Sequence, residues 1–101
     1  MKTIDELNKE LYNASYNNNL EMVKYLVEQG ATNLNLALSY ASQNNNLEIV
    51  KYLVEQGATH LNDALVNASK NNNLEMANFL KFVIDISKNN KNNKQNTLLI
   101  F

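Results

Sequence analysis

Cysteine is absent from this chain, and glycine occurs only twice in 101 residues. Without cysteine there is no disulfide bond, no thiolate metal site and no cysteine nucleophile. The two glycines, Gly30 and Gly57, stand at equivalent positions, so the chain has no glycine-rich loop that would bind phosphate. The single histidine, His60, has no accompanying cluster of ligand residues, and one histidine cannot hold a metal ion. We therefore expect no metal and no cofactor.

The chain also carries little net charge and no long apolar run. The formal net charge is −1, so the chain as a whole is not attracted to nucleic acid or to an anionic membrane. No apolar run approaches the length of a transmembrane helix, and the first residues become acidic where a signal peptide needs an apolar core. These absences predict an intracellular, cytoplasmic protein that contacts neither nucleic acid nor membrane.

What the chain does contain is an internal repeat. The sequence Asn-Asn-Asn-Leu-Glu begins at Asn17, Asn44 and Asn71, a constant period of 27 residues (44 − 17 and 71 − 44). The longer stretches LEMVKYLVEQGAT (20–32) and LEIVKYLVEQGAT (47–59) follow the same period. Such a period indicates one supersecondary unit stacked on copies of itself. We place three units, 7–33, 34–60 and 61–87, in one domain of residues 1–88.

The first half of each unit has the hydrophobic pattern of a helix. Leu34, Leu38 and Ala41 fall at i, i+4 and i+7, which is one face of a helix. The asparagine triplet ends this helix, because asparagine tolerates the left-handed backbone region. The same inward trio is Leu7, Leu11 and Ala14 in the first unit and Leu61, Leu65 and Ala68 in the third, and the predicted N-caps are Asp5, Thr32 and Thr59.

A second helix begins at each Leu-Glu pair and carries a broad apolar surface. The last asparagine of each triplet (Asn19, Asn46 and Asn73) is its predicted N-cap. Gly30 and Gly57 end the helix in the first two units, at the position just after the C-cap. Because Gly-Ala-Thr leads directly into the next unit, there is no room for a strand between units.

This unit resembles the ankyrin repeat. The usual ankyrin pattern, roughly TPLHxAAxxGHLEVVKLLLExGADVN, matches residues 38–59 (LSYASQNNNLEIVKYLVEQGAT). Among ankyrin arrays, the chain is most similar to the asparagine-rich ones of giant amoebal viruses and social amoebae, and a viral source would place it in the host cytoplasm. The resemblance implies a helical solenoid that binds other proteins.

Two features depart from the ankyrin pattern. The Thr-Pro before the leucine is absent, and the chain contains no proline at all. The ankyrin period is about 33 residues, so about six residues are missing here. The gap falls where ankyrin repeats build a β-hairpin finger. We predict an all-α, ankyrin-like helical solenoid of three helix-turn-helix repeats in which β-hairpin fingers are absent.

The third unit differs from the others, as terminal repeats usually do. It has Phe82-Val83-Ile84 where the first unit has Glu28-Gln29-Gly30, so its second helix is expected to continue to about Lys88. Residues 89–101 are predicted to be a flexible polar tail with an apolar end at 97–101. That end either folds back over the last repeat or serves as a ligand for a groove such as that of a PDZ domain.

No catalytic arrangement is present among the remaining polar residues. The aspartates fall in unrelated places and form no pair suited to acid–base catalysis. Ser15, Ser42 and Ser69 recur with the period, and packing against the second helix explains them better than a nucleophile without a base. We predict that the protein is not an enzyme.

The solvent-facing side of the first helices is the candidate binding surface. With Leu34, Leu38 and Ala41 facing inward, a turn of 100° per residue directs four other positions outward. The three units differ most at these positions, whereas the exposed stripe of the second helix is identical in the first two units. The predicted partner-binding residues are Lys9, Tyr12, Asn13 and Tyr16, then Leu36, Ser39, Tyr40 and Gln43, and finally Asp63, Val66, Asn67 and Lys70.

These patterns predict a non-catalytic protein–protein interaction module. Its partner is another protein, bound through the exposed face of the first helices, and a monomer is favoured over a homo-oligomer. The alternative is a structural or self-associating repeat unit that pairs through imperfectly capped ends.

Overall fold

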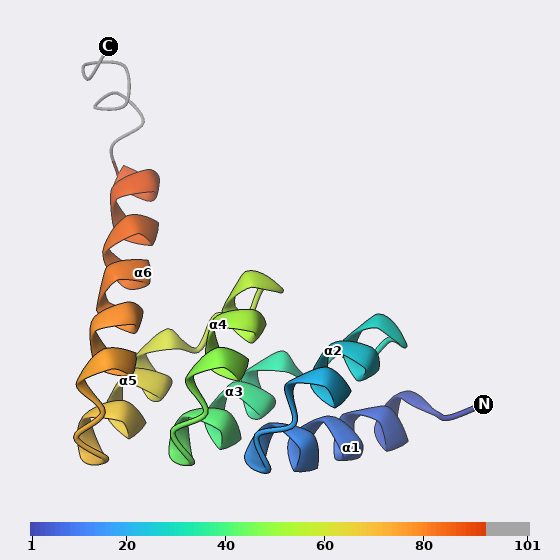
Figure 1. The fold of residues 1–101 in the computed structure, drawn as a ribbon. Helices are drawn as coiled ribbons and strands as arrows, with labels where there is room; N and C mark the ends of the chain where they lie inside the picture. Colours follow the sequence, from blue (N-terminus) through green and yellow to red (C-terminus); the bar gives the residue numbers. More distant parts are fainter. Residues whose placement is uncertain (93–101) are drawn as a thin grey trace.

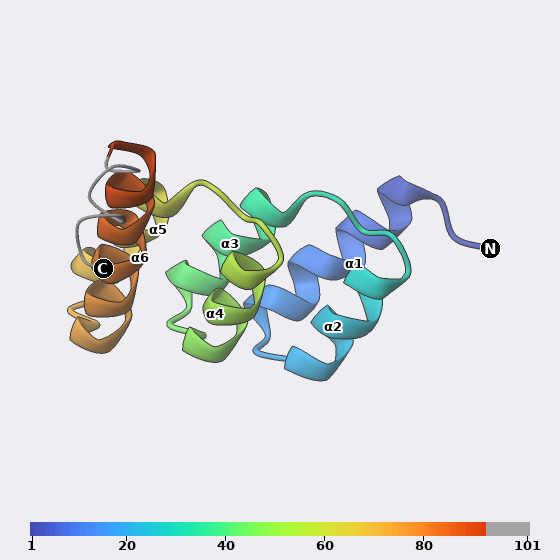
Figure 2. The ribbon, with the colours of Figure 1, turned by 90° about the horizontal axis from the view of Figure 1, so that it is seen from above.

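A computed structural model describes residues 1–92 of the chain, and the side chains of residues 1–89. This part forms six helices and no strand: α1 (Ile4–Tyr16), α2 (Leu20–Glu28), α3 (Leu34–Gln43), α4 (Leu47–Glu55), α5 (Leu61–Lys70) and α6 (Leu74–Asn92). Successive helices form three hairpins that stand side by side (Figure 1). α1, α3 and α5 make one layer, and α2, α4 and α6 make the other (Figure 2).

This arrangement confirms the predicted all-α solenoid of three helix-turn-helix repeats. Residues 29–33 and 56–60 connect one repeat to the next as short turns, in place of the β-hairpin fingers of longer ankyrin repeats. Within the layer of first helices, α3 packs against α1 on one side and α5 on the other.

The two kinds of turn have the backbone conformations that the sequence predicts. Asn18, Asn45 and Asn72, the middle residues of the triplets, have φ angles of 60°, 62° and 56°. Asparagine is enriched at such left-handed positions because its short side chain bonds locally to the backbone. Gly30 and Gly57, with φ angles of 115° and 113°, end α2 and α4. An L-residue with a Cβ atom would be strained there.

The predicted N-caps of the first helices are wrong. The N-cap residues are Thr3, Asn33 and His60, not Asp5, Thr32 and Thr59. Thr32 and Thr59 are held by Asn8 on α1 and Asn35 on α3, through both their backbone N–H groups and their hydroxyls. α1 begins at Ile4, earlier than the pattern implied.

α1 starts at Ile4 with a capping box. The Thr3 hydroxyl accepts a hydrogen bond from the Glu6 N–H, and the Glu6 carboxylate accepts one from the Thr3 N–H (2.9 Å). The hydrogen bonds from the Thr3 backbone and hydroxyl to this carboxylate lower the pKa of Glu6 from its ordinary value. The capping box therefore satisfies the N–H groups of Thr3 and Glu6 at the start of α1.

The last asparagine of the triplet is the N-cap residue of α2 and α4, as predicted, and two of the three asparagines make a capping hydrogen bond. Asn19 and Asn73 each accept a hydrogen bond from the N–H group three residues ahead. Asn46 makes no such bond. It is buried, and its amide donates instead to the Ser15 and Tyr16 carbonyls of the preceding repeat.

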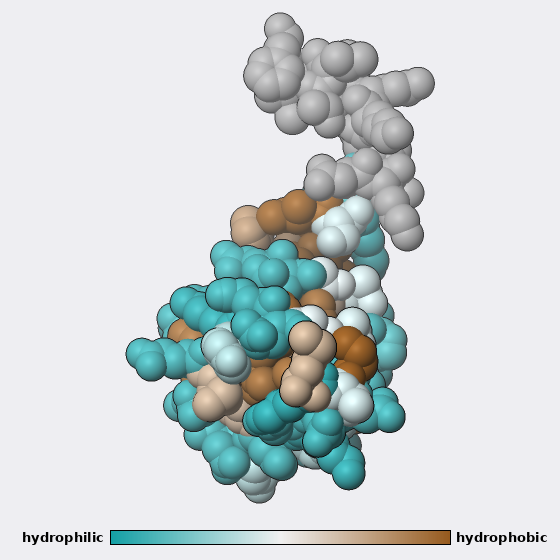
Figure 3. Space-filling model, turned by 90° about the vertical axis from the view of Figure 1, so that its right-hand side faces the viewer, coloured by the Kyte–Doolittle hydropathy of each residue, from teal (hydrophilic) through white to brown (hydrophobic). Residues whose placement is uncertain are grey.

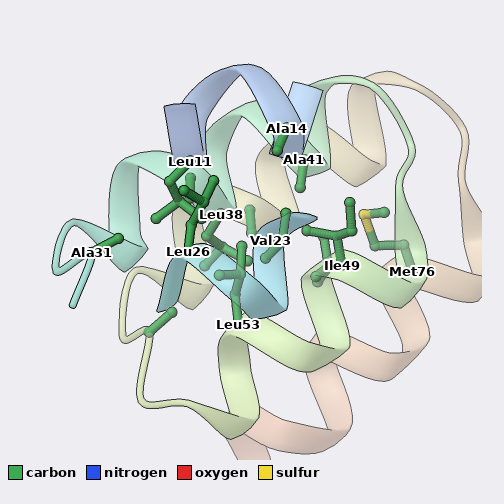
Figure 4. Close-up of a cluster of buried hydrophobic side chains, with 14 of the residues drawn as sticks. Leu11, Ala14, Val23, Leu26, Ala31, Leu38, Ala41, Ile49, Leu53 and Met76 are labelled. Carbon is green, nitrogen blue, oxygen red and sulfur yellow. The ribbon is translucent and has the colours of Figure 1, made fainter. Parts of the chain in front are cut away.

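The core is a continuous row of leucine, valine, isoleucine, methionine and alanine side chains between the two layers (Figure 4). Leu11, Leu38 and Leu53 have no more than 1 % of their surface exposed. All residues of the three predicted inward trios, on α1, α3 and α5, are buried or half-buried. Ala37 and Ala64 are fully buried as well, although they were not among the predicted inward residues. They lie on the first helices where one repeat meets the next.

The last helix is longer than expected. α6 runs for 19 residues to Asn92, beyond the predicted end near Lys88. Its second half leaves Phe82 and Ile86 exposed. The rest of the predicted tail, residues 93–101, lies outside the described residues, and so does its apolar end.

Leu53 provides a test of the packing between repeats. Leu53→Ala removes a fully buried side chain from the middle repeat, and we expect it to lower the free energy of unfolding by about 2–5 kcal/mol. A small domain has about 5–15 kcal/mol of stability in total, so the loss will be large in a urea or thermal unfolding experiment. Glu48→Ala, on the exposed side of the same helix, is the control and should change stability by less than about 0.5 kcal/mol. Equal effects of the two changes would contradict this packing.

Candidate protein-binding surface

The twelve residues predicted to bind a partner all lie on the outer side of α1, α3 and α5. Eight of them are exposed, four (Tyr12, Ser39, Tyr40 and Asn67) are half-buried, and none belongs to the core. The half-burial was not predicted, and in the tyrosines it results from contact between neighbouring repeats. The surface is therefore continuous across the repeat junctions.

Three tyrosines form a cluster at the junction of the first two repeats. The ring of Tyr40 on α3 lies 5.9 Å from that of Tyr12 and 6.4 Å from that of Tyr16, both on α1, measured between ring centroids. These are the separations of directly interacting aromatic pairs. With Lys9 and Asn13, the rings line a shallow hollow of about 470 Å³. Tyr16 remains 48 % exposed, so an aromatic surface is available to a partner.

A second hollow lies at the next junction along the row. It has a volume of about 350 Å³ and is lined by Asn33, Asn35, Leu36, Ser39, His60 and Asp63. Its character is more polar, with the His60 Nδ1 atom 3.8 Å from an Asp63 carboxylate oxygen. Leu36 provides an exposed apolar edge. Successive junctions thus present one aromatic hollow and one mixed hollow on the same face.

Asparagine side chains join the repeats beneath this surface. The Oδ1 atom of Asn8 accepts hydrogen bonds from the N–H groups of Thr32 (2.9 Å) and Asn33 (3.0 Å), and its Nδ2 atom donates to the Thr32 hydroxyl (3.4 Å). Asn35, one period later, makes the same three bonds to Thr59 and His60. Each side chain thereby satisfies two backbone donors in the connection between repeats.

A second set of asparagines joins the repeats at the opposite end of the first helices. Asn44 and Asn46 donate to the Tyr16 carbonyl at 2.6 and 3.0 Å, and Asn71 donates to the Gln43 carbonyl at 2.9 Å. These carbonyls belong to the last turn of a helix, where intrahelical partners are missing. The asparagines of the triplets therefore bridge repeats as well as forming turns.

Sequence analysis missed this bridging role. It assigned the asparagine triplets to turns and caps, and it did not consider Asn8, Asn35 and Asn62. These three recur with the 27-residue period outside the triplets, and that recurrence is the signal that could have identified them.

Tyr40 is an exception to the bridging pattern. In the third repeat, the equivalent residue Asn67 donates a hydrogen bond to the Ser42 hydroxyl (2.9 Å). Tyr40 makes no such bond to the equivalent Ser15, whose buried hydroxyl has no hydrogen-bond partner among the described residues. Hydrogen bonding between repeats therefore does not explain why a tyrosine occupies this position.

The outer side of the second helices has a structural role. The Nζ atom of Lys24 lies 5.7 Å from the centre of the Tyr52 ring, and that of Lys51 lies 5.7 Å from the centre of the Phe79 ring. Both are within the range of cation–π attraction. Burial, together with Glu28 and Glu55, raises the pKa of the Tyr52 hydroxyl. Contacts between repeats thus explain why lysine occupies both of these positions.

The described residues, 1–92, contain no group of three His, Cys, Asp or Glu side chains that could hold a metal ion. None of their helices is both long enough and apolar enough to cross a bilayer.

A family model described as ankyrin repeats (3 copies) matches residues 6–63. The chain belongs to the ankyrin repeat family. Searches of curated proteins and of solved structures found no match. Ankyrin repeats generally bind other proteins and are typically non-catalytic, so the coarse function of this chain is that of an interaction module. The match ends at Asp63, so α6, where the third repeat differs most from the first two, lies outside it.

The bridging asparagines of this ankyrin domain provide a matched pair of variants. Asn35→Ala leaves the N–H groups of Thr59 and His60 without their acceptor, and we expect it to lower the free energy of unfolding by about 1–2 kcal/mol. Asn62→Ala is the control, because Asn62 has the same place in the last repeat and is exposed. It should change stability by less than about 0.5 kcal/mol in the same urea titration. If the two variants lose equal stability, bridging is not the role of Asn35.

Proposed function

We propose that this ankyrin domain binds a partner protein, in the cytoplasm, across the outer face of α1, α3 and α5. The observation that carries the proposal is the exposed tyrosine cluster in the hollow between the first two repeats. Tyrosine is enriched at binding hot spots, because its ring supplies a large contact area at low conformational cost.

Tyr40 supports this choice of surface. An asparagine at its position would satisfy the Ser15 hydroxyl, as Asn67 satisfies Ser42. A residue that breaks a local structural rule is expected where function requires it. The tyrosine adds aromatic area to the surface and leaves a buried hydroxyl without a partner, which is consistent with selection for binding.

Comparison of the repeats points to the same face. Lys9, Leu36 and Asp63 occupy one outward position in the three repeats and share no chemistry. On the second helices, Lys24 and Lys51 occupy one position in the first two repeats, and each contacts an aromatic ring of the next repeat; the third repeat has Asn78 there. Between the first two repeats, variation is therefore concentrated on the face that repeat packing does not constrain.

The spacing of the two hollows suggests how a partner would lie. Packed helices are about 8–10 Å apart, and a polyproline II segment advances about 3.1 Å per residue with about three residues per turn. A partner segment in this conformation would therefore place side chains three residues apart, on one side of the segment, in successive hollows. An apolar or aromatic side chain suits the hollow at Tyr16, and a polar one suits the hollow at His60 and Asp63.

The partner is first captured by photo-crosslinking. A photoreactive amino acid at Ser39, in the second hollow, should capture it in cells, and the same group at Glu48 on the second helices should not. The captured protein is then identified by mass spectrometry and purified for affinity measurements.

Two tyrosines of similar exposure then test the surface. Tyr16→Ala should weaken binding by at least about 1 kcal/mol, roughly fivefold in Kd, because Tyr16 supplies exposed aromatic area in the first hollow. Tyr25→Ala is the control, because Tyr25 is 56 % exposed but lies on α2. It should leave Kd unchanged in calorimetric titrations. Weaker binding by Tyr25→Ala alone would show that the partner uses another face.

A further inference from the structure

The two end repeats reveal which side of a repeat each position faces. Among the described residues, no repeat packs on the first repeat before α1 or on the third repeat after it. Ala37 and Ala64 are fully buried, whereas the equivalent Glu10 is half-buried, so this position faces the preceding repeat. Ser15 and Ser42 are fully buried whereas Ser69 is exposed, so that position faces the following repeat.

The junction between the second and third repeats is closed by three asparagine amides. Asn67 donates to the Ser42 hydroxyl, Asn71 to the Gln43 carbonyl, and Asn73 to the Asn45 side-chain oxygen, at 2.9, 2.9 and 3.2 Å. The donors lie on the third repeat and the acceptors on the second.

The two ends of the molecule carry the two halves of this same junction. The first repeat has the identical donors, Asn13, Asn17 and Asn19, and all three are exposed. The third repeat has the equivalent acceptors in Ser69, the backbone carbonyl of Lys70, and Asn72, and these residues are exposed too. One end is thus chemically complementary to the other.

Apolar residues of the N-terminal face also have counterparts that are buried at the interior junctions. Met22 is 40 % exposed, whereas its counterparts Ile49 and Met76 are fully buried against the preceding repeat. Tyr25 is the counterpart of Tyr52 and Phe79, which receive a lysine from the preceding repeat. A view of the N-terminal end shows apolar residues in the middle of this face, with hydrophilic ones around them (Figure 3). The face retains residues that are typical of an interior junction.

We propose that the chain stacks head to tail on a second copy of itself, with α1 and α2 of one copy against α5 and α6 of the other. The contact continues the junction between repeats from one molecule to the next. It is heterologous, because two different faces meet, so it leaves a free face at each end and assembles open chains of copies.

Glu10 keeps this association weak. It stands where Ala37 and Ala64 are fully buried, and it pairs with Lys2. Stacking would bury this ion pair or force it apart, and either outcome is unfavourable. The Thr3–Glu6 capping box also occupies the N–H group of Glu6, one of the two from which Asn62 of another copy would otherwise accept a hydrogen bond. Monomers therefore predominate at low concentration, and assembly needs a high local concentration.

Sedimentation velocity from low micromolar to millimolar concentration tests the proposal. The wild-type sedimentation coefficient should rise with concentration without reaching the plateau of a closed dimer. Glu10→Ala restores the interior residue and should lower the dissociation constant by about tenfold or more, because no charge is then buried. Glu21→Ala, an exposed carboxylate of α2, is the matched control and should behave as wild type.

Two blocked variants determine the orientation of the copies. Met22→Glu blocks the N-terminal face and Ser69→Glu blocks the C-terminal face, each at an exposed position whose interior counterparts are fully buried. Each variant alone should remain monomeric, and an equimolar mixture should form a one-to-one dimer and nothing larger. The proposal is overturned if wild type and Glu10→Ala both stay monomeric at millimolar concentration. It is overturned equally if either blocked variant associates alone as strongly as wild type.

Discussion

The side-chain amide of asparagine is the interaction on which this structure depends. A repeat of 27 residues leaves only a short turn between α2 and α3, so backbone groups at the ends of the first helices have few partners of their own. Asn8 and Asn35 supply acceptors at one end of these helices, and Asn44 and Asn71 supply donors at the other. An amide can do both because it carries donors and an acceptor on one short side chain. This geometry accounts for the asparagines that recur at these bridging positions.

Much of the fold could be predicted from local sequence. The spacing of Leu34, Leu38 and Ala41 identified the inner face of a first helix, and Gly30 identified the end of a second. The absence of a finger followed from the length of the period. That Thr32 and Thr59 are not the caps could not be predicted, because they are held by asparagines 24 positions earlier in the chain, which a local pattern does not include.

The same limit explains what was missed at the surface. Asn19 and Asn46 have the same sequence around them, yet only Asn46 has a preceding repeat to bridge. Its amide nitrogen donates to the Ser15 carbonyl, and its side-chain oxygen makes no capping bond. The helical period predicts that Tyr40 faces outward. It cannot show that contact with the rings of Tyr12 and Tyr16 leaves Tyr40 half-buried. Both outcomes depend on tertiary contacts between residues about one period apart.

The short reach of the bridging bonds has a consequence for folding. The Asn46–Ser15 bond joins residues 31 positions apart, and no other side-chain hydrogen bond among the described residues spans a longer stretch of chain. Low contact order favours fast folding, and a linear array can nucleate at any repeat and grow outward. The middle repeat, α3 and α4, has a neighbour on both sides, so its amide protons should exchange with solvent most slowly. The end repeats open first, and the molecule unravels from its ends towards its centre.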